Sequence, residues 1–371
     1  MERDQVSFDT VEDAIQAIAD GQMVIVVDDE DRENEGDLIM AASKATPEQV
    51  GFMIRHTSGI LCTPLRKNMA ERLNLPPMVS ENDAPLRTAF TISVDYKHGM
   101  KTGISSEDRA ATVRGLANPN SGARDFVRPG HVFPLIAREG GVLVRAGHTE
   151  ANIDLCDMAR LPAVGLLGEL MNDDGSVQRL SQLREFAKLH GLKLISIADM
   201  IRHRLWREIL IECVRRYEVR TEIGAARAHL YRNIADGTHH LALVFGRPDL
   251  TKTVAVRMHR ANAFDDLFAD SGDERGGLVH RALKTLESKG QGIFVYLRTP
   301  TDAVVGHDAP SGIELPKVHE ESDGNYWREI GIGAQILKDL GVRAIELLTP
   351  GETLYKGLDG FGLEIARTEK I

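Results

Sequence analysis

The sequence predicts a mixed α/β protein with two domains, each a mixed sheet covered by helices. Its 371 residues are enough for two buried cores. Short β-branched runs alternate with segments of helical periodicity in both halves of the chain. A long helical stretch separates the halves, beginning at Ser196 with Asp199 and passing Trp206 on its way to about Arg216. We therefore expect one domain at residues 1–205 and a second at residues 206–371.

The elements expected in the first half carry start and stop signals. Thr10 begins a capping box ahead of an apolar helical face that ends at Gly21. Residues 23–27 are apolar and mostly β-branched, which is typical of a buried strand. Pro47 then opens a second helix, and Gly59 lies just past its end. Further strands are expected at residues 59–65, 89–94 and 141–145, and a further helix at residues 150–161.

The second half has strands and helices of its own. Apolar, β-rich runs predict strands at residues 240–245, 253–258, 292–297 and 344–348. Helical periodicity predicts helices at residues 277–288 and 331–340. Residues 302–325 are polar and contain prolines, so we expect a long loop there.

Composition and charge exclude several classes of partner. The formal net charge of -10 opposes sequence-independent binding to nucleic acid or to an anionic membrane surface. The 3 cysteines, Cys62, Cys156 and Cys213, are too few and too scattered for a disulfide framework. The start of the chain lacks the apolar region of a signal peptide, and no run of about 18 apolar residues occurs. We therefore expect a cytoplasmic protein without a membrane or nucleic-acid partner.

The most informative segment is the acidic run that follows the first strand. Residues 28–37, DDEDRENEGD, contain seven acidic side chains. Acidic groups this close repel one another, so folding them together requires a cation such as a divalent metal, an arginine or a charged substrate. A solvated acidic turn is the alternative, whereas the spacing does not match the calcium loop of an EF-hand. Loops at strand ends often carry catalytic groups, so Arg32, Glu33, Glu35 and Asp37 are candidate site residues.

A second candidate is the segment RAGHTE, where a predicted strand meets a predicted helix. Backbone N–H groups at a helix N-terminus suit a phosphate, and Arg145 and the hydroxyl of Thr149 can complete such a cradle. His148 can bind a metal through one ring nitrogen. Alone, however, a histidine near a helix start is more often a cap or a surface residue.

Three further residues are ambiguous when each is considered alone. Glu169 is an acid inside an apolar run, and it is equally compatible with a structural and a functional role. His131 lies in a proline-flanked loop, which favours a structural role. Cys62 lies in an apolar stretch and is expected to be a small core residue.

Taken together and in order, seven segments resemble one enzyme family. They are DDEDRENEGDLI, SGILC, RTAFTISVD, TGISSEDRA, GHVFPL, REGGVLVRAGHTEA and GELMNDDG. This series resembles 3,4-dihydroxy-2-butanone 4-phosphate synthase over roughly residues 8–203. The resemblance implies a dimeric lyase of riboflavin biosynthesis. Such an enzyme converts D-ribulose 5-phosphate into L-3,4-dihydroxy-2-butanone 4-phosphate and formate with Mg²⁺ or Mn²⁺.

The resemblance also implies roles for individual residues. Glu33 and His148 would be the metal ligands, and His131 and Glu169 would be essential for catalysis. The first proton of the reaction would go to Asp37, Glu35 or Glu169, a choice that the sequence leaves open. The residues implied to hold the substrate are Arg32, Glu33, Asp37, Arg145, Ala146, Gly147, His148, Thr149 and Glu169.

From about residue 215 onward the chain resembles GTP cyclohydrolase II. The resemblance rests on HLALVFG, GGLVHRALKTLESKGQGIFVYLR, GIGAQILKDLGVRAIELLT and GLDGFGLEI. That family binds zinc through three cysteines in the pattern C-x10-C-x-C, which should fall at about residues 260–273. No cysteine occurs in this stretch, so a thiolate site is missing and zinc is not expected.

Other motifs of that family are altered as well. A phosphate-binding run rich in arginine and glycine is replaced by TPTDAVVG after Arg298. In YWREIG, Tyr326 replaces an acid and Ile330 replaces a tyrosine, while Lys356 is displaced from the family's position. We therefore expect a domain that is not a GTP cyclohydrolase and is retained for packing, dimer contacts or regulation. The alternatives are a bifunctional enzyme with an unorthodox metal site and a nucleotide-sensing or protein-docking module.

Overall fold

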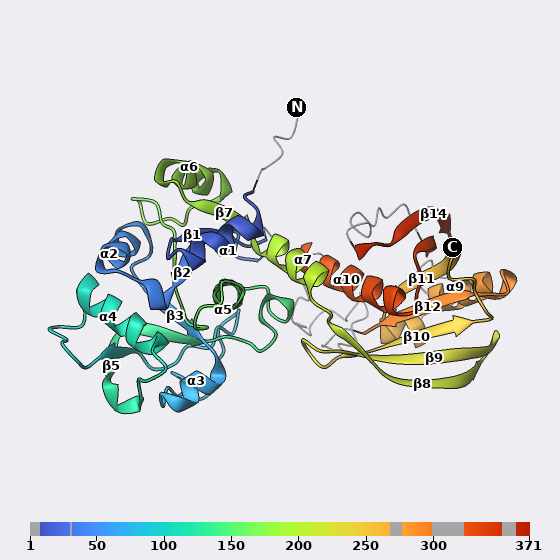
Figure 1. Ribbon diagram of the computed structural model, residues 1–371, viewed down its shortest axis with the longest axis horizontal. Coiled ribbons are helices and arrows are strands. Elements are labelled where there is room, and N and C mark those ends of the chain that lie inside the picture. Colours follow the sequence, from blue (N-terminus) through green and yellow to red (C-terminus); the bar gives the residue numbers. More distant parts are fainter. Residues whose placement is uncertain (1–7, 30–31, 268–276, 299–322, 351–360) are drawn as a thin grey trace, which may run out of the picture. The chain divides into compact units, whose positions relative to one another are not determined.

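The computed structural model describes residues 8–29, 32–267, 277–298, 323–350 and 361–371 (Figure 1). The chain folds into two compact units, Met1–His203 and Arg204–Ile371. Each unit contains a mixed sheet with helices, so the predicted class is confirmed. Among the described helices, none is both long and apolar enough to cross a bilayer. Lys356 and residues 302–322 of the expected loop lie outside the described residues.

The first unit is built on a seven-stranded sheet with the order β4-β5-β3-β6-β2-β1-β7. Helices α2, α4 and α6 contribute to the core on one face, and α1 and α5 contact the strands from the other. The strands are β1 (Val24–Val27), β2 (Gly36–Ala41), β3 (Cys62–Leu65), β4 (Val94–Tyr96), β5 (Phe126–Ile136), β6 (Gly165–Glu169) and β7 (Lys193–Ser196). The helices are α1 (Val11–Ala19), α2 (Pro47–His56), α3 (Lys67–Arg72), α4 (Ser106–Ala117), α5 (His148–Met158) and α6 (Leu180–His190). Helix α7 (Ile197–Arg207) begins in the first unit, and its last four residues belong to the second.

Local signals start the first two helices where the sequence predicts. The hydroxyl of Thr10 accepts a hydrogen bond from the Asp13 N–H at 3.1 Å and caps α1. Thr46 and Gln49 form a reciprocal capping box at the start of α2, with Pro47 in its first turn. All residues of β1 are buried, in agreement with its β-branched, apolar sequence.

Strand register brings polar side chains to one face of the sheet. β2 and β6 are antiparallel, and Asp37 lies directly opposite Glu169. Cys62 of β3 pairs with Leu167, two residues before Glu169 on β6. Because side chains alternate along a strand, Asp37, Glu169 and Cys62 share the face that α5 covers.

Several expected elements differ from the structure. Residues 141–143 form a 3-10 turn instead of a strand, because Gly140 and Gly141 have φ angles of 89° and 65°, which a strand does not allow. Of the expected strand at residues 89–94, only Val94 belongs to β4. α7 ends at Arg207, and the chain continues as a strand rather than as the expected helix.

The second unit has a seven-stranded sheet with the order β14-β13-β11-β12-β10-β9-β8. Strands β14, β13, β11 and β12 are parallel neighbours, and the remaining pairs are antiparallel. The strands are β8 (Ile211–Thr221), β9 (Gly224–Asn233), β10 (His239–Phe245), β11 (Thr253–Arg260), β12 (Gly292–Leu297), β13 (Ala344–Thr349) and β14 (Glu364–Lys370). The helices are α8 (Ala263–Leu267), α9 (Leu278–Ser288) and α10 (Asp323–Asp339), the last beginning earlier than expected.

We expect the second unit to lose stability in acid through His240. Its side chain is buried, its Nδ1 accepts a hydrogen bond from the Arg298 N–H at 3.2 Å, and burial lowers its pKa from 6.5 to about 4. A pKa depressed in the folded state gives a stabilisation that is complete above pH 6.5 and is lost as the pH falls through 4. The size of this loss is about 3 kcal/mol.

The variant H240N should therefore lose less unfolding free energy than the wild type between pH 7 and pH 4. Urea unfolding followed by tryptophan fluorescence measures this difference, because Trp206 and Trp327 both belong to the second unit. The same pH dependence in both proteins would contradict the assignment to His240.

Candidate active site

Residues 28–29 and 32–35 of the acidic run belong to a loop organised around one carboxylate. Asp28 accepts hydrogen bonds from the backbone N–H groups of Glu33 at 3.2 Å and Glu35 at 3.1 Å. The guanidinium of Arg32 donates to the same carboxylate at 2.7 Å and also to Glu33. Within this loop Asn34 adopts a left-handed backbone conformation, with φ of 52°. Asp28 is not among the predicted candidates, although its place directly after a strand and before a turn is a signal for such a role.

Asp28, Glu33 and His148 form a cluster that can hold a metal ion. Their ligand atoms all lie within 4.8 Å of one another, and His148 Nδ1 is 3.6 Å from Glu33 Oε2. His148 is buried, and its Nε2 has no hydrogen-bond partner in the described part of the chain. An unsatisfied buried nitrogen is costly, and a ligand that bonded to Nε2 would remove that cost. Two carboxylates and an imidazole are a donor set that fits a divalent ion such as Mg²⁺ or Mn²⁺.

Charge within this cluster shifts the pKa of its members. Burial opposes the charged form of His148, but the charge of Asp37, the nearby carboxylate of Glu33 and the charge of Asp28 outweigh it and raise its pKa to about 9. Burial likewise opposes the charged form of Glu33, whereas its interactions with His148 and Arg32 lower its pKa to about 2. At neutral pH an imidazolium therefore lies beside the ionised carboxylate of Glu33, and a metal ion bound through His148 would have to displace its proton.

Asp37 and Glu169 are neighbouring carboxylates on adjacent strands. Asp37 is 3% exposed, and its Oδ1 has no partner among the described residues. Ser58 donates to the Glu169 carboxylate through its hydroxyl at 2.6 Å. Burial raises the pKa of Asp37 to about 7, and the charges of Glu169 and Glu35 add to this effect against that of His148. A carboxylate pair with one pKa near neutrality can exchange a proton with a bound molecule.

The segment RAGHTE forms the turn into α5. Gly147 is the N-cap of α5, and it has no side chain with which to cap the first turn. Arg145 donates to Glu150 at 2.7 Å and to the hydroxyl of Thr88 at 3.1 Å. A Cβ on Gly147 would lie 2.4 Å from Arg145 Nη1, so a glycine is needed for the guanidinium to lie against the turn. With Thr149 buried beside it, the turn combines a helix N-terminus and a fixed cation, as a phosphate site does.

His131 lies on the same face of the sheet but farther along it. Cys62 pairs with Phe133 of β5, so His131 falls in the strand row that contains Glu169. Two strand spacings separate these residues, which corresponds to about 10 Å. Asp95 holds His131 twice, accepting from its backbone N–H at 2.8 Å and bonding its Nδ1 at 2.7 Å. Asp95 is a further residue of the site, and no motif in the sequence indicates it.

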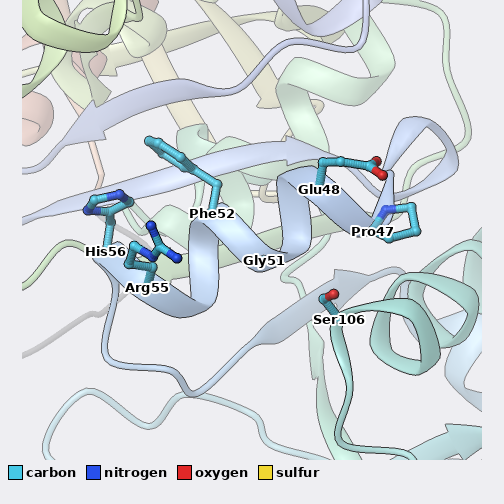
Figure 2. A pocket seen from close by; sticks show the side chains of 7 residues that line it. All are labelled: Pro47, Glu48, Gly51, Phe52, Arg55, His56 and Ser106. Carbon is cyan, nitrogen blue, oxygen red and sulfur yellow. The ribbon is translucent and has the colours of Figure 1, made fainter.

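A separate groove of about 420 Å³ runs along α2, and Figure 2 shows the side chains that line it. Phe52, Arg55 and His56 line it from α2, and Ser106 lines it from the start of α4. None of the predicted site residues contributes to its lining. The groove and the metal-type cluster are therefore different features of the first unit.

The two halves of the chain match two families. Residues 12–203 match 3,4-dihydroxy-2-butanone 4-phosphate synthase, and residues 212–370 match GTP cyclohydrolase II. The chain is 45% identical to the monofunctional riboflavin biosynthesis protein RIBA 2, chloroplastic, of Arabidopsis thaliana, over 99% of this chain and 78% of that protein. It is also 45% identical to the bifunctional riboflavin biosynthesis protein RIBA 1, chloroplastic, of the same plant, over 96% of this chain and 68% of that protein.

Solved structures show the same relationship. RibBX from A. baumannii, a two domain 3,4-dihydroxy-2-butanone 4-phosphate synthase, has a TM-score of 0.81 and 34% identity, over 98% of this chain and 99% of that one. A 3,4-dihydroxy-2-butanone 4-phosphate synthase in complex with two magnesium ions has a TM-score of 0.52 and 45% identity, over 53% of this chain and 96% of that one. The chain therefore belongs to the 3,4-dihydroxy-2-butanone 4-phosphate synthase family, with a GTP cyclohydrolase II domain fused behind the synthase domain.

Proposed function

We propose that the first domain converts D-ribulose 5-phosphate into L-3,4-dihydroxy-2-butanone 4-phosphate and formate with Mg²⁺ or Mn²⁺. The observation that carries this proposal is the cluster of Asp28, Glu33 and His148, in which a buried ring nitrogen lacks a partner among the described residues. The relative that was solved with two magnesium ions supports dependence on a divalent ion. The identity of the substrate is inferred from the family to which the first domain belongs.

The reaction requires proton transfers at neighbouring carbons of a sugar phosphate. A base removes the proton alpha to the carbonyl and gives an enediol. Loss of water, a shift of the carbon skeleton and addition of water then release one carbon as formate. A divalent ion, when bound, stabilises negative charge on the sugar oxygens. Asp37 and Glu169 would take and return the protons, with Glu35 as the third carboxylate of the group.

The remaining residues of the site would bind and orient the substrate. Arg145 and the uncapped first turn of α5 would hold the phosphate, with the Thr149 hydroxyl beside them. Arg32 would neutralise part of the acidic loop while contacting the sugar. His131, held by Asp95 in one orientation, would serve as the further acid or base at the far end of the row.

We also propose that the active form is a homodimer. Large apolar side chains are exposed in the first unit beside residues of the proposed site. Ile60 is 52% exposed two residues after Ser58, and Ile104 is 52% exposed directly after Gly103, whose added Cβ would meet His131. Apolar groups placed around a site in this way favour a covering subunit.

We propose further that the second domain does not open the ring of GTP. The cysteines expected at residues 260–273 are missing. Near that position His259 Nε2 lies 2.7 Å from an oxygen of Asp266, and the hydroxyl of Tyr296 donates to the same carboxylate at 2.7 Å. These groups satisfy one another's hydrogen-bonding capacity inside the second unit, as the members of a structural network do. Relatives with 45% identity include a monofunctional and a bifunctional protein, so similarity alone does not decide the activity.

The variant E33Q should lose formate production from ribulose 5-phosphate by roughly a hundredfold or more, because it removes a charged ligand of the proposed metal site. Coupled detection of formate in the presence of Mg²⁺ measures this loss. The variant E48Q, which alters an exposed glutamate on α2, is the matched control and should keep wild-type activity. Wild-type turnover by E33Q would exclude the proposed metal site.

The variant G147A should raise the KM for ribulose 5-phosphate by roughly tenfold, because its Cβ would displace the guanidinium of Arg145 from the phosphate turn. Steady-state kinetics at saturating Mg²⁺ separate KM from kcat. Gly122 has a similar φ of -120° and no close neighbour, so G122A is the control for the added methyl group. An unchanged KM in G147A would show that the substrate phosphate does not bind at this turn.

The full-length protein should not consume GTP with either Mg²⁺ or Zn²⁺, because the second domain lacks the thiolate ligands. Chromatography of GTP after prolonged incubation tests this, with ribulose 5-phosphate turnover in the same sample as the positive control. Formation of a ring-opened product would show that the domain is an active cyclohydrolase with an unorthodox metal site.

A further inference from the structure

Arg179 connects helix α6 to the acidic loop. It precedes the first residue of α6, and its Nη1 donates to the carbonyl oxygen of Glu33 at 2.8 Å and to that of Asn34. These bonds join residues that are 146 and 145 positions apart in the chain. A single guanidinium nitrogen therefore holds two successive carbonyl groups in the loop that carries Glu33.

This contact complements the bonds that Asp28 makes within the loop. Asp28 holds the N–H groups of Glu33 and Glu35, whereas Arg179 holds the carbonyl groups of Glu33 and Asn34. The peptide groups on both sides of Asn34 are thereby fixed, and its left-handed φ of 52° is kept in place. The direction in which the Glu33 side chain leaves the loop follows from this backbone geometry.

Helix α6 is itself anchored, so Arg179 connects the loop to a rigid element. Leu183 of α6 is buried and lies so close to Gly36 that a Cβ there would be 2.5 Å from it. Farther along α6, the ring of Phe186 lies 6.0 Å from that of Phe52 on α2, which Figure 2 shows beside the groove. The loop is therefore attached to α6 by a charged contact and by a packing contact.

We infer that Arg179 is a positioning residue for the metal ligand Glu33. By holding the loop carbonyls, it keeps the Glu33 carboxylate 3.6 Å from His148 before any ion is bound. The role of Glu33 as a ligand rests on the proposed function, whereas the contact between Arg179 and the loop does not. The alternative is an exposed arginine that contributes only to the start of α6.

The test compares the metal-free proteins R179M, R179K and K188M with the wild type. Lys188 is an exposed cation on the same helix, so K188M is the matched control for loss of a positive charge. We expect R179M to weaken Mn²⁺ binding roughly tenfold in calorimetry. We also expect it to speed amide hydrogen exchange at residues 33–36 while β1 keeps wild-type exchange. R179K should recover part of both effects, because an ammonium group can donate to the same carbonyls.

Unchanged exchange at residues 33–36 in R179M would overturn the inference, whatever the metal affinity. Faster exchange with wild-type Mn²⁺ affinity would also overturn it, because the contact would then not act on Glu33. Equal effects of K188M and R179M on exchange and on Mn²⁺ affinity would show that the loss of net charge is the cause. That result would overturn the inference as well. Absence of Mn²⁺ binding to the wild-type protein would instead contradict the proposed function, and the exchange measurement would still decide whether Arg179 holds the loop.

Discussion

Negative charge crowded around a buried imidazole is the constraint on which the first unit depends. Asp28, Glu33 and Asp37 lie close to His148, and burial removes much of the water that would screen them. The fold offsets part of this repulsion through Arg32 and through the loop N–H groups that bond to Asp28. Within the described part of the chain, it leaves His148 Nε2 and Asp37 Oδ1 without hydrogen-bond partners. Native structures keep such unsatisfied groups mainly where a ligand completes them.

The second unit shows the opposite arrangement of similar groups. His259 and Asp266 are also a buried imidazole and carboxylate, but Tyr296 and the Asn262 N–H bond to the same carboxylate. The polar groups of this network form hydrogen bonds with one another, so the network stabilises the fold without requiring an ion. The cluster around His148 and the network around His259 thus differ less in the kinds of side chain they contain than in how far those side chains satisfy one another. That difference favours a ligand at the first cluster rather than at the second.

Local signals made part of the fold and site predictable from the sequence. Thr10 and Pro47 mark helix starts because capping depends only on neighbouring residues. Glu33 and His148 are recognisable from their motifs, and the structure brings them together. The wrong prediction of a strand at residues 141–145 also came from a local signal, the apolar run in this segment. The positive φ angles of Gly140 and Gly141 turn the chain there instead. The pairing of Asp37 with Glu169 depends on strand register, which no local pattern determines.

The residues that the sequence did not single out, Asp28, Asp95 and Arg179, act through backbone groups or through another side chain. Such roles carry no motif of their own, because any carboxylate or guanidinium that reaches the correct place can perform them. For Arg179 that place is set by the end of β6 and the start of α6, about 145 residues from the loop it contacts. A ligand loop that is ordered before binding does not have to lose its conformational freedom when the ion arrives. With Glu33 in its proposed role as a ligand, metal affinity in this fold would depend on the helix that restrains the loop as well as on the carboxylates that face the ion.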